Sequence, residues 1–309
     1  MRILVTGATG LVGTAFTSLA AARHYDIVAL TRKARSEHDI EWDPQNGTIQ
    51  ASRLEGFDAV VHLAGDSIAA GRWSQAKKTR IRDSRVQGTK LLCKTLAQLK
   101  DRPSTLISAS AIGYYGDRGD QILDENSAAG SLFLSELCKA WEQATAPAND
   151  AGIRVVNARI GVVLSPQGGA LAQMLTPFRL GVGGIVGNGR QYWSWIALED
   201  LAHAFLHAIS NDSLRGPVNF VSPQPATNTE FTKALGKALH RPTLLPMPAF
   251  AAKMALGEMA TELLLASARV IPSQLTESGY EFRHADLTGT LESLVSEQPH
   301  KVAAAATAV

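Results

Sequence analysis

The sequence predicts an α/β fold in which a doubly wound parallel sheet is followed by a smaller α/β lobe. Segments rich in Val, Ile and Leu alternate with longer helical patterns along the first half of the chain. These apolar segments are nearly continuous, as expected for strands buried on both faces of a parallel sheet. A glycine-rich turn joins the first strand to the first helix. Together these features predict a sheet covered by helices on both faces.

The segments expected to be buried strands are Ile3–Thr6, Asp26–Leu30, Ala59–Leu63, Thr105–Ser108 and Arg154–Leu164. The expected helices between them are Val12–Arg23, Ser74–Leu99 and Leu132–Asp150. Within 42–49, the pair Asn46-Gly47 is typical of a type I′ β-hairpin. A small β excursion is therefore expected to replace one regular βα unit.

The composition of the chain changes after Leu164. Residues 168–189 are rich in glycine, and several prolines occur within 217–248. We expect residues 1–165 to form the first domain, with 193–221 returning to it. Residues 166–192 and 222–295 are expected to form the smaller lobe, and 296–309 a disordered tail. A long amphipathic helix is predicted from Pro248 to Arg269, as the core of the lobe or as the face of a homodimer.

Composition excludes several classes of protein. The 309 residues are 45% hydrophobic and 19% charged, with a formal net charge of +2, which is typical of a globular protein and gives no reason to expect nucleic acid as a partner. No apolar run is long enough to span a bilayer, so no membrane partner is expected. Cys93 and Cys138 are expected to be buried free thiols, without metal-ligand spacing, in a cytoplasmic protein.

A phosphate-binding turn follows the first predicted strand and opens the first helix. It reads Gly7-Ala8-Thr9-Gly10-Leu11-Val12-Gly13. Glycines are needed where the backbone turns tightly, approaches a pyrophosphate and packs helix against strand. The helix N-terminus then offers its free N–H groups to the phosphates. This context predicts a Rossmann-type dinucleotide site that includes Thr9, Leu11 and Val12.

The end of the second strand indicates which dinucleotide binds. Sites that prefer NAD place a carboxylate about 20 residues beyond the last glycine, where it holds the ribose 2′-hydroxyl. Here that place is held by Thr31-Arg32-Lys33. A guanidinium suits a 2′-phosphate, so the sequence favours NADP(H).

Three motifs together resemble the extended short-chain dehydrogenase/reductases, the family of the NAD-dependent epimerases and dehydratases. They are the glycine turn, the run Asp58–Gly65 and the run Ser108–Gly116. A narrower resemblance, over residues 1–292, is to a divergent branch of nucleoside-diphosphate-sugar epimerase-like proteins, some labelled as cell-division inhibitors. It is carried by Arg72-Trp73, Ser84-Arg85, Cys138–Glu142, Gly187–Gln191, Ser194–Ile196 and Gly257–Met259.

The resemblance implies roles for particular residues. Leu63, Ala64, Gly65 and Ser108 would border the cofactor. Ser110 matches the catalytic serine that hydrogen-bonds a substrate oxygen. Lys139 matches the lysine of the family's Tyr-x-x-x-Lys pair, which holds the nicotinamide ribose and lowers the pKa of the tyrosine for proton transfer.

The sequence departs from this pattern at two places. Ser135 stands four residues before Lys139, where the family has its tyrosine, and a serine hydroxyl is too weak an acid without an adjacent base. We therefore considered Tyr114 or Tyr115 for the proton role, with packing of the pocket wall as the alternative. Arg85 stands where common members of the family have an asparagine, and it is expected to bind an anionic substrate.

The substrate side is expected near 187–196. Gln191, Trp193 and Trp195 are predicted to contact a ring-bearing substrate, with plain packing of the lobe as the alternative. Two functions remain open. The first is an NADP(H)-dependent oxidoreductase or epimerase acting on a small alcohol, a carbonyl or a sugar nucleotide. The second is a regulatory module that senses NADP(H), its chemistry lost with the tyrosine.

Overall fold

Eight strands form the central sheet of the computed structural model, which describes residues 1–69 and 71–296. Every strand pair is parallel except β3–β4 at one edge. This confirms the predicted doubly wound sheet. From one edge to the other the strands are β12 (Gly216–Phe220), β8 (Arg154–Ile160), β6 (Thr105–Ala111), β5 (Ala59–His62), β1 (Arg2–Thr6), β2 (Asp26–Thr31), β3 (Ile40–Asp43) and β4 (Thr48–Ile49).

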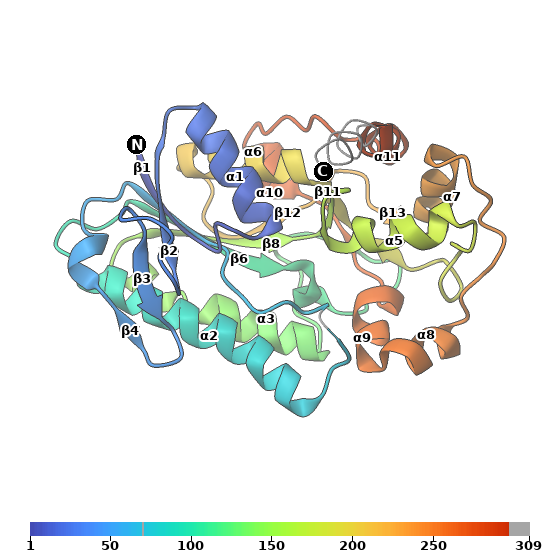
Figure 1. Cartoon of the computed structure of the whole chain (residues 1–309), viewed down its shortest axis with the longest axis horizontal. Helices are drawn as coiled ribbons and strands as arrows, with labels where there is room; N and C mark the ends of the chain where they lie inside the picture. Colours follow the sequence, from blue (N-terminus) through green and yellow to red (C-terminus); the bar gives the residue numbers. More distant parts are fainter. Residues whose placement is uncertain (70, 297–309) are drawn as a thin grey trace, which may run out of the picture.

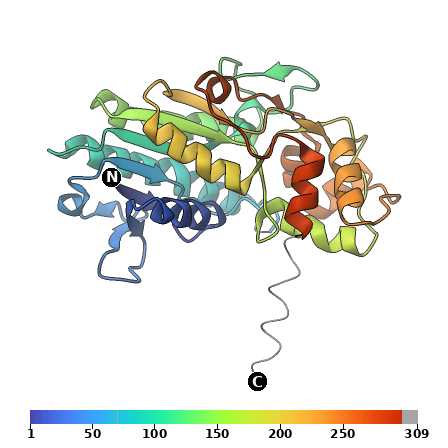
Figure 2. The same ribbon diagram turned by 90° about the horizontal axis from the view of Figure 1, so that it is seen from above.

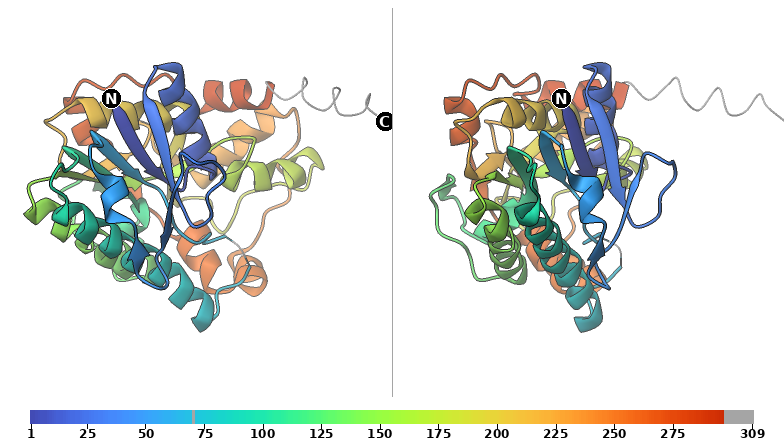
Figure 3. Two further views of the ribbon diagram at one scale, coloured as in Figure 1. Left: turned by 60° about the vertical axis from the view of Figure 1, so that its left-hand side comes forward. Right: turned by 90° about the vertical axis from the view of Figure 1, so that its left-hand side faces the viewer.

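Helices cover both faces of this sheet, as Figure 1 and Figure 3 show. One face carries α1 (Leu11–Ala22) and α6 (Leu198–Ser210), which pack against each other. The other face carries α2 (Gln75–Gln98), α3 (Phe133–Gln143) and α4 (Ala146–Asp150). The strand that returns to the main sheet after α6 is β12, which extends the sheet beyond β8.

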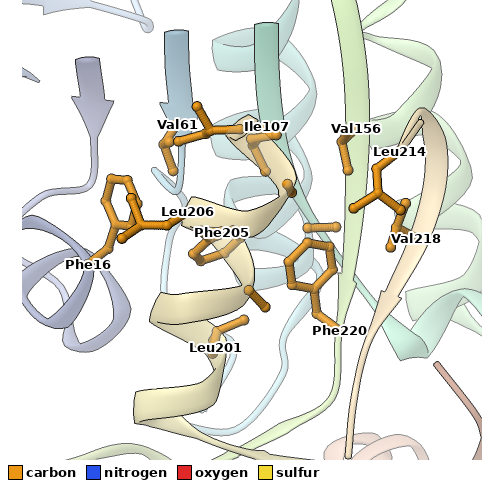
Figure 4. Close-up of a cluster of buried hydrophobic side chains, with 14 of the residues drawn as sticks. Phe16, Val61, Ile107, Val156, Leu201, Phe205, Leu206, Leu214, Val218 and Phe220 are labelled. Atoms are coloured by element: carbon orange, nitrogen blue, oxygen red, sulfur yellow. The ribbon is translucent and has the colours of Figure 1, made fainter. Parts of the chain in front are cut away.

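Aromatic rings fill the core between the sheet and the α1–α6 layer. Phe205 of α6 lies between Phe16 of α1 and Phe220 of β12, with ring centroids 5.9 and 5.2 Å away (Figure 4). All three side chains are fully buried. Fully burying a Phe side chain contributes roughly 1.5–3 kcal/mol, so this contact fixes α6 on the sheet. On the other face Cys93 is buried, and Cys138 is buried farther along; both thiols are free, as predicted.

The rest of the chain forms a mostly helical lobe at one end of the sheet, seen on the right in Figure 2. Leu171, Trp193, Phe231 and Leu291 belong to its hydrophobic core. Its elements are β9 (Val162–Leu164), α5 (Gly169–Arg179), β10 (Tyr192–Trp193), β11 (Trp195–Ala197), β13 (Ala226–Thr227), α7 (Asn228–Ala238), α8 (Ala249–Leu256), α9 (Glu258–Ala260), a π-helical turn (Thr261–Leu265) and α11 (Leu287–Ser296). Short pieces β7 (Ile122–Leu123), β14 (Arg269–Val270) and α10 (Ser273–Glu277) run back along the sheet.

Two contacts tie this lobe to the helices under the sheet. The two oxygens of the Glu262 carboxylate accept hydrogen bonds from the backbone N–H groups of Phe133 and Leu134, at 3.0 and 2.8 Å. Lys78 of α2 forms an ion pair with Glu258 at 2.9 Å. The start of α3 is therefore capped by a residue from the far end of the chain.

Two predicted elements, the long helix and the strand 154–164, differ from the structure. The predicted long helix is broken at Gly257, whose φ of 64° ends α8, and Met254 on α8 is 74% exposed. The interpretation of α8 as part of the core of the lobe is therefore wrong at Met254. The alternative, that this helix forms the face of a homodimer, stays a prediction. The predicted strand 154–164 divides at Gly161, after which β9 pairs with β11 in a separate sheet.

The hairpin forms, but not with a type I′ turn. Its loop is 44–47, and within it only Gly47 has a positive φ. The Asp43 carboxylate holds this wider turn by accepting the N–H groups of Gln45 and Asn46. Ser296 ends α11, whereas the rest of the predicted tail lies outside the described residues. Among the helices described, none combines the length and the apolarity needed to cross a bilayer.

Candidate functional site

The glycine turn lies where β1 ends, beside the end of β5. Gly7 has a φ of 67°, and a Cβ there would lie 2.8 Å from the carbonyl carbon of Leu63. A Cβ on Gly13 would lie only 2.1 Å from the Gly7 carbonyl oxygen. Only glycine allows this close approach of turn, helix and neighbouring strand. The turn has the shape that a phosphate-binding loop requires.

The first turn of α1 presents backbone N–H groups at this edge. Its N-cap, Gly10, makes no side-chain cap bond, and the first helical N–H groups have no acceptor within the helix. Thr9 and Gly10 are exposed, whereas Leu11 and Val12 are half-buried against the fold. The arrangement can bind an anion at the positive end of the helix dipole.

Two cations follow β2 at the same edge. Arg32 and Lys33 are both exposed, and Thr31 is half-buried. The nearby Glu41 carboxylate is held by the backbone N–H of Ala34 at 2.8 Å. Hydrogen bonds from Asn46, and beyond them the charge of Arg32, hold the pKa of Asp43 below its usual value. The end of β2 is thus lined by cations, and its neighbouring carboxylates have backbone partners of their own.

The end of β5 is anchored to β1. Thr6 Oγ1 accepts the N–H groups of Leu63 and Ala64, at 3.0 and 3.1 Å, and its hydroxyl contacts His62 Nδ1 at 2.7 Å. His62 Nε2 lies 2.9 Å from Thr89 Oγ1. Burial lowers the pKa of His62 to about 4, so this imidazole is neutral and structural. The bonds hold 63–65 beside the glycine turn.

Ser108 does not reach this edge, contrary to its predicted place beside a cofactor. Its side chain is fully buried within β6, and its register partner on β5 is His62. Its Oγ has no hydrogen-bond partner among the described residues. Ser108 is covered because the strand continues for three more residues, to Ala111, before it reaches the open end of the sheet.

Ser110, one residue before the end of β6, is also buried but has an acidic partner. Its Oγ donates a hydrogen bond to Glu142 Oε1 on α3 at 2.7 Å. The Arg159 guanidinium on β8 donates to both oxygens of the same carboxylate, at 2.8 and 2.9 Å. Ser110 and Arg159 are register partners on adjacent strands. The three side chains form a compact serine–carboxylate–guanidinium group.

Arg159 is charged in this group. Burial alone would lower its pKa, but the hydrogen bonds and charge of Glu142 raise it above its usual value. Its guanidinium also stacks on the ring of Tyr114, 3.5 Å from the centroid. The side-chain exposure of Arg159 is 3% and that of Glu142 is 13%, so the pair is largely removed from water.

Tyr115 does not fit the proton role that was considered for it. Its side chain is fully buried; its hydroxyl donates to Asn219 Oδ1 at 2.7 Å and accepts from Arg159 Nη1 at 3.0 Å. Burial raises the pKa of Tyr115 to about 12, so the phenol keeps its proton. Tyr114 is half-buried and lies against Arg159, which agrees with the alternative of a pocket wall.

Lys139 also lies away from Ser110. It pairs with Glu136 on its own helix at 3.0 Å, its side chain is 40% exposed, and it lines an outer groove between α2 and α3. Cys138, the residue before Lys139 on α3, is buried. Burial raises the pKa of this thiol to about 12. The assignment of Lys139 as a catalytic and cofactor-binding residue is therefore wrong in this geometry.

The predicted substrate contacts in the second lobe are wrong as well. Gln191 is 6% exposed and donates to the carbonyl oxygens of Val186 and Leu264. Trp193 packs on Phe231 in the core of the lobe. Trp195 is fully buried. These side chains stabilise the lobe, which is the packing alternative.

Arg85, for which a contact with an anionic substrate stays a prediction, lies beside Gly65 at the end of β5. A Cβ on Gly65 would lie 3.2 Å from its guanidinium carbon. The residues that sequence reasoning missed are Glu142 and Arg159. The strand 154–160 also contains Arg154 and Asn157, so the charge of Arg159 alone did not single it out.

Comparison with known proteins identifies the family. The model of the NAD-dependent epimerase/dehydratase family matches residues 3–221. The chain belongs to this family. A second model, a domain of unknown function named DUF1731, matches residues 247–294, which include α8 and most of α11. No group of three His, Cys, Asp or Glu side chains in the described part of the chain could hold a metal ion.

Individual relatives match nearly the whole chain. Epimerase family protein Mb2239 from Mycobacterium bovis is 45% identical over 283 residues, covering 91% of this chain and 93% of that protein. The crystal structure of human epimerase family protein SDR39U1 with NADPH has a TM-score of 0.89 at 35% identity, covering 96% of this chain and 99% of that one. A nucleoside-diphosphate sugar epimerase from Corynebacterium glutamicum has a TM-score of 0.79 at 37% identity, covering 98% of this chain and 60% of that one.

Proposed function

We propose that this chain is an NADP(H)-dependent oxidoreductase that acts on the alcohol or carbonyl group of a small molecule. The observation that carries the proposal is the 2.7 Å hydrogen bond between Ser110 and Glu142. A serine replaces the phenol of a proton-transfer site only when a base lies next to it, and here the carboxylate occupies that place.

The residues at the sheet edge fit the cofactor. The space that a Cβ on Gly7 or Gly13 would fill is needed for a pyrophosphate to approach the backbone. Arg32 and Lys33 are exposed at the end of β2, where a 2′-phosphate would lie. The crystal structure of the human relative contains NADPH, which supports the same cofactor here.

When bound, this cofactor supplies or accepts a hydride. Side chains of the protein transfer the proton. In the direction of alcohol oxidation, the substrate hydroxyl gives its proton to Ser110 Oγ while the hydrogen of Ser110 passes to Glu142 Oε1. Reduction of a carbonyl reverses both transfers. Arg159 orients the carboxylate by donating to both of its oxygens.

The second candidate, a protein that senses NADP(H) without turnover, is favoured by one feature. Arg159 donates to both oxygens of the Glu142 carboxylate, so this carboxylate already belongs to a buried ion pair that a purely structural role would explain. Hydride transfer separates the two functions. An oxidoreductase consumes NADPH when it is mixed with a suitable small aldehyde, ketone or oxo acid, so the absorbance of NADPH falls. With a sensor, the absorbance of NADPH stays unchanged with all of these compounds.

Substitution of Gly13 by alanine is expected to weaken NADPH binding at least about tenfold, or ~1.4 kcal/mol. The added Cβ would lie 2.1 Å from the Gly7 carbonyl oxygen, so the phosphate-binding turn must shift. Isothermal titration calorimetry measures the effect. Ser18→Ala, at an exposed position on the same helix, is the control. Unchanged affinity in Gly13→Ala would show that the turn does not bind the cofactor.

Substitution of Arg32 by alanine is expected to weaken NADPH by about tenfold or more, because a charge-assisted contact to the 2′-phosphate is lost. NADH has no such phosphate, so its affinity should stay within about twofold under the same conditions. The measurement is a calorimetric titration of both cofactors into both proteins. Equal losses for NADPH and NADH would mean that Arg32 does not read the 2′-phosphate.

A further inference from the structure

Arg85 carries a half-buried positive charge at the open end of the sheet. Its Nη1 donates to the backbone carbonyl oxygens of Asp66 and Ile81, at 2.9 and 3.2 Å. Its guanidinium lies 5.0 Å from the centroid of the Trp141 ring. Burial lowers the pKa of Arg85 despite nearby negative charge. The side chain is thus firmly positioned and poorly solvated.

Arg85 has no carboxylate within ion-pair distance among the residues that the structure describes. The nearest acidic side chain, Asp66, is bound by the ammonium group of Lys77 at 2.8 Å. Lys77 is itself 7% exposed, so it keeps that carboxylate occupied. Arg159, by contrast, is fully paired with Glu142. A half-buried guanidinium held by backbone carbonyls, with no carboxylate in ion-pair range among the described residues, suits a site whose anion arrives with a ligand.

The guanidinium and the proposed reacting group lie at the ends of neighbouring strands. His62 on β5 is the register partner of Ser108 on β6, so Gly65 follows β5 at the same edge of the sheet that Ser110 approaches on β6. Arg85 also faces Trp141, the residue before the Glu142 that accepts the hydrogen bond of Ser110. Gly65 lets the guanidinium approach the end of β5, since a Cβ there would lie 3.4 Å from Nη2. An anion held by Arg85 would therefore lie beside the group bound to Ser110.

We propose that Arg85 binds the carboxylate of the substrate, and that the substrates are 2-oxo acids and the corresponding 2-hydroxy acids. In these compounds the carboxylate is attached directly to the reacting carbon, which requires an anion site and a reacting group at one edge of the sheet, as Arg85 and Ser110 are at the ends of β5 and β6. A planar carboxylate also accepts two parallel hydrogen bonds from a guanidinium. The inference rests on the proposed function and names its substrate class.

The test uses two pairs of probes that differ in the negative charge. Oxamate is compared with neutral oxamide, and phenylpyruvate with phenylacetone. Each is titrated calorimetrically into the protein with and without NADPH. In wild type at least one acid should bind tenfold or more tightly than its neutral partner. Arg85→Met should remove that preference. Arg85→Lys should retain part of it, because lysine keeps the positive charge but lacks the two parallel N–H donors of the guanidinium.

Arg82→Met is the matched control, because Arg82 lies on the same helix, is exposed and lines the outer groove. It should bind the acids as wild type does. The proposal is wrong if neither acid is preferred over its neutral partner, if Arg82→Met loses as much affinity, or if dihydroxyacetone phosphate is the anion preferred.

The outcomes also separate this proposal from the proposed function. Loss of NADPH affinity in Arg85→Met would make Arg85 a cofactor ligand and overturn the inference alone. Acid binding that depends on Arg85, in a protein that does not bind NADPH, would keep the anion site and overturn the proposed function. Retained NADPH affinity with lost acid binding supports both.

Discussion

Ser110→Ala is expected to lower kcat about 10²–10⁴-fold on any substrate that the protein turns over, because it removes the hydroxyl that exchanges the proton. Glu142→Gln should reduce kcat by a similar factor. The amide keeps the shape of the side chain but cannot accept a proton from Ser110, whose Oγ is 2.7 Å away. KM should change much less than kcat, since neither group carries the anion contact assigned to Arg85.

The matched control for this prediction is Glu136→Gln. It makes the same chemical change on the same helix, but Glu136 is 60% exposed and bonds only to Lys139 among the described contacts. Its kcat should equal that of wild type. Thermal melting of each variant shows whether a loss of activity reflects unfolding. A Ser110→Ala protein that is folded and fully active would disprove the relay.

Arg159→Met is expected to lower the free energy of unfolding by about 3–5 kcal/mol, which is typical of a buried pair that loses one partner. The Glu142 carboxylate would remain 13% exposed with no cation, and the Tyr115 hydroxyl would lose the donor at 3.0 Å. Urea denaturation followed by circular dichroism measures the loss. A change below about 1 kcal/mol would mean that water replaces the guanidinium.

Two further variants test the cause of that destabilisation. Arg159→Met combined with Glu142→Met removes both charges, so the double variant should be more stable than Arg159→Met alone. Lys139→Met breaks an exposed pair on the same helix, which contributes about 0–1 kcal/mol. Equal losses in Arg159→Met and Lys139→Met would contradict the distinction between the buried and the exposed pair.

Most of the fold followed from local patterns. The apolar strand segments and the glycine turn predicted the parallel sheet and its first βαβ unit because burial and backbone conformation act through neighbouring residues. The errors arose where one residue interrupts a longer pattern. Gly257 adopts a positive φ that ends α8, and at Gly161 the chain leaves the main sheet for the second lobe.

The candidate site was predicted less well, because it depends on which face of α3 meets the sheet. Lys139 was assigned from its residue type in the Tyr-x-x-x-Lys motif. Helical periodicity instead places Cys138 and Glu142, four residues apart, on one face of α3, and it turns Lys139 about 100° away from that face. The apolar positions of the helix already indicated that face. No local pattern indicated that Arg159, from a strand more than a dozen residues later, would pair with Glu142.

The cap on α3 has a consequence for the evolution and regulation of the molecule. Glu262 belongs to the domain of unknown function at 247–294, yet its carboxylate lies at the positive pole of the helix dipole of α3. That helix carries the base of the proposed relay. If undocking of the C-terminal segment changes affinity at the site, then occupancy of the site must change the docking equilibrium by the same factor.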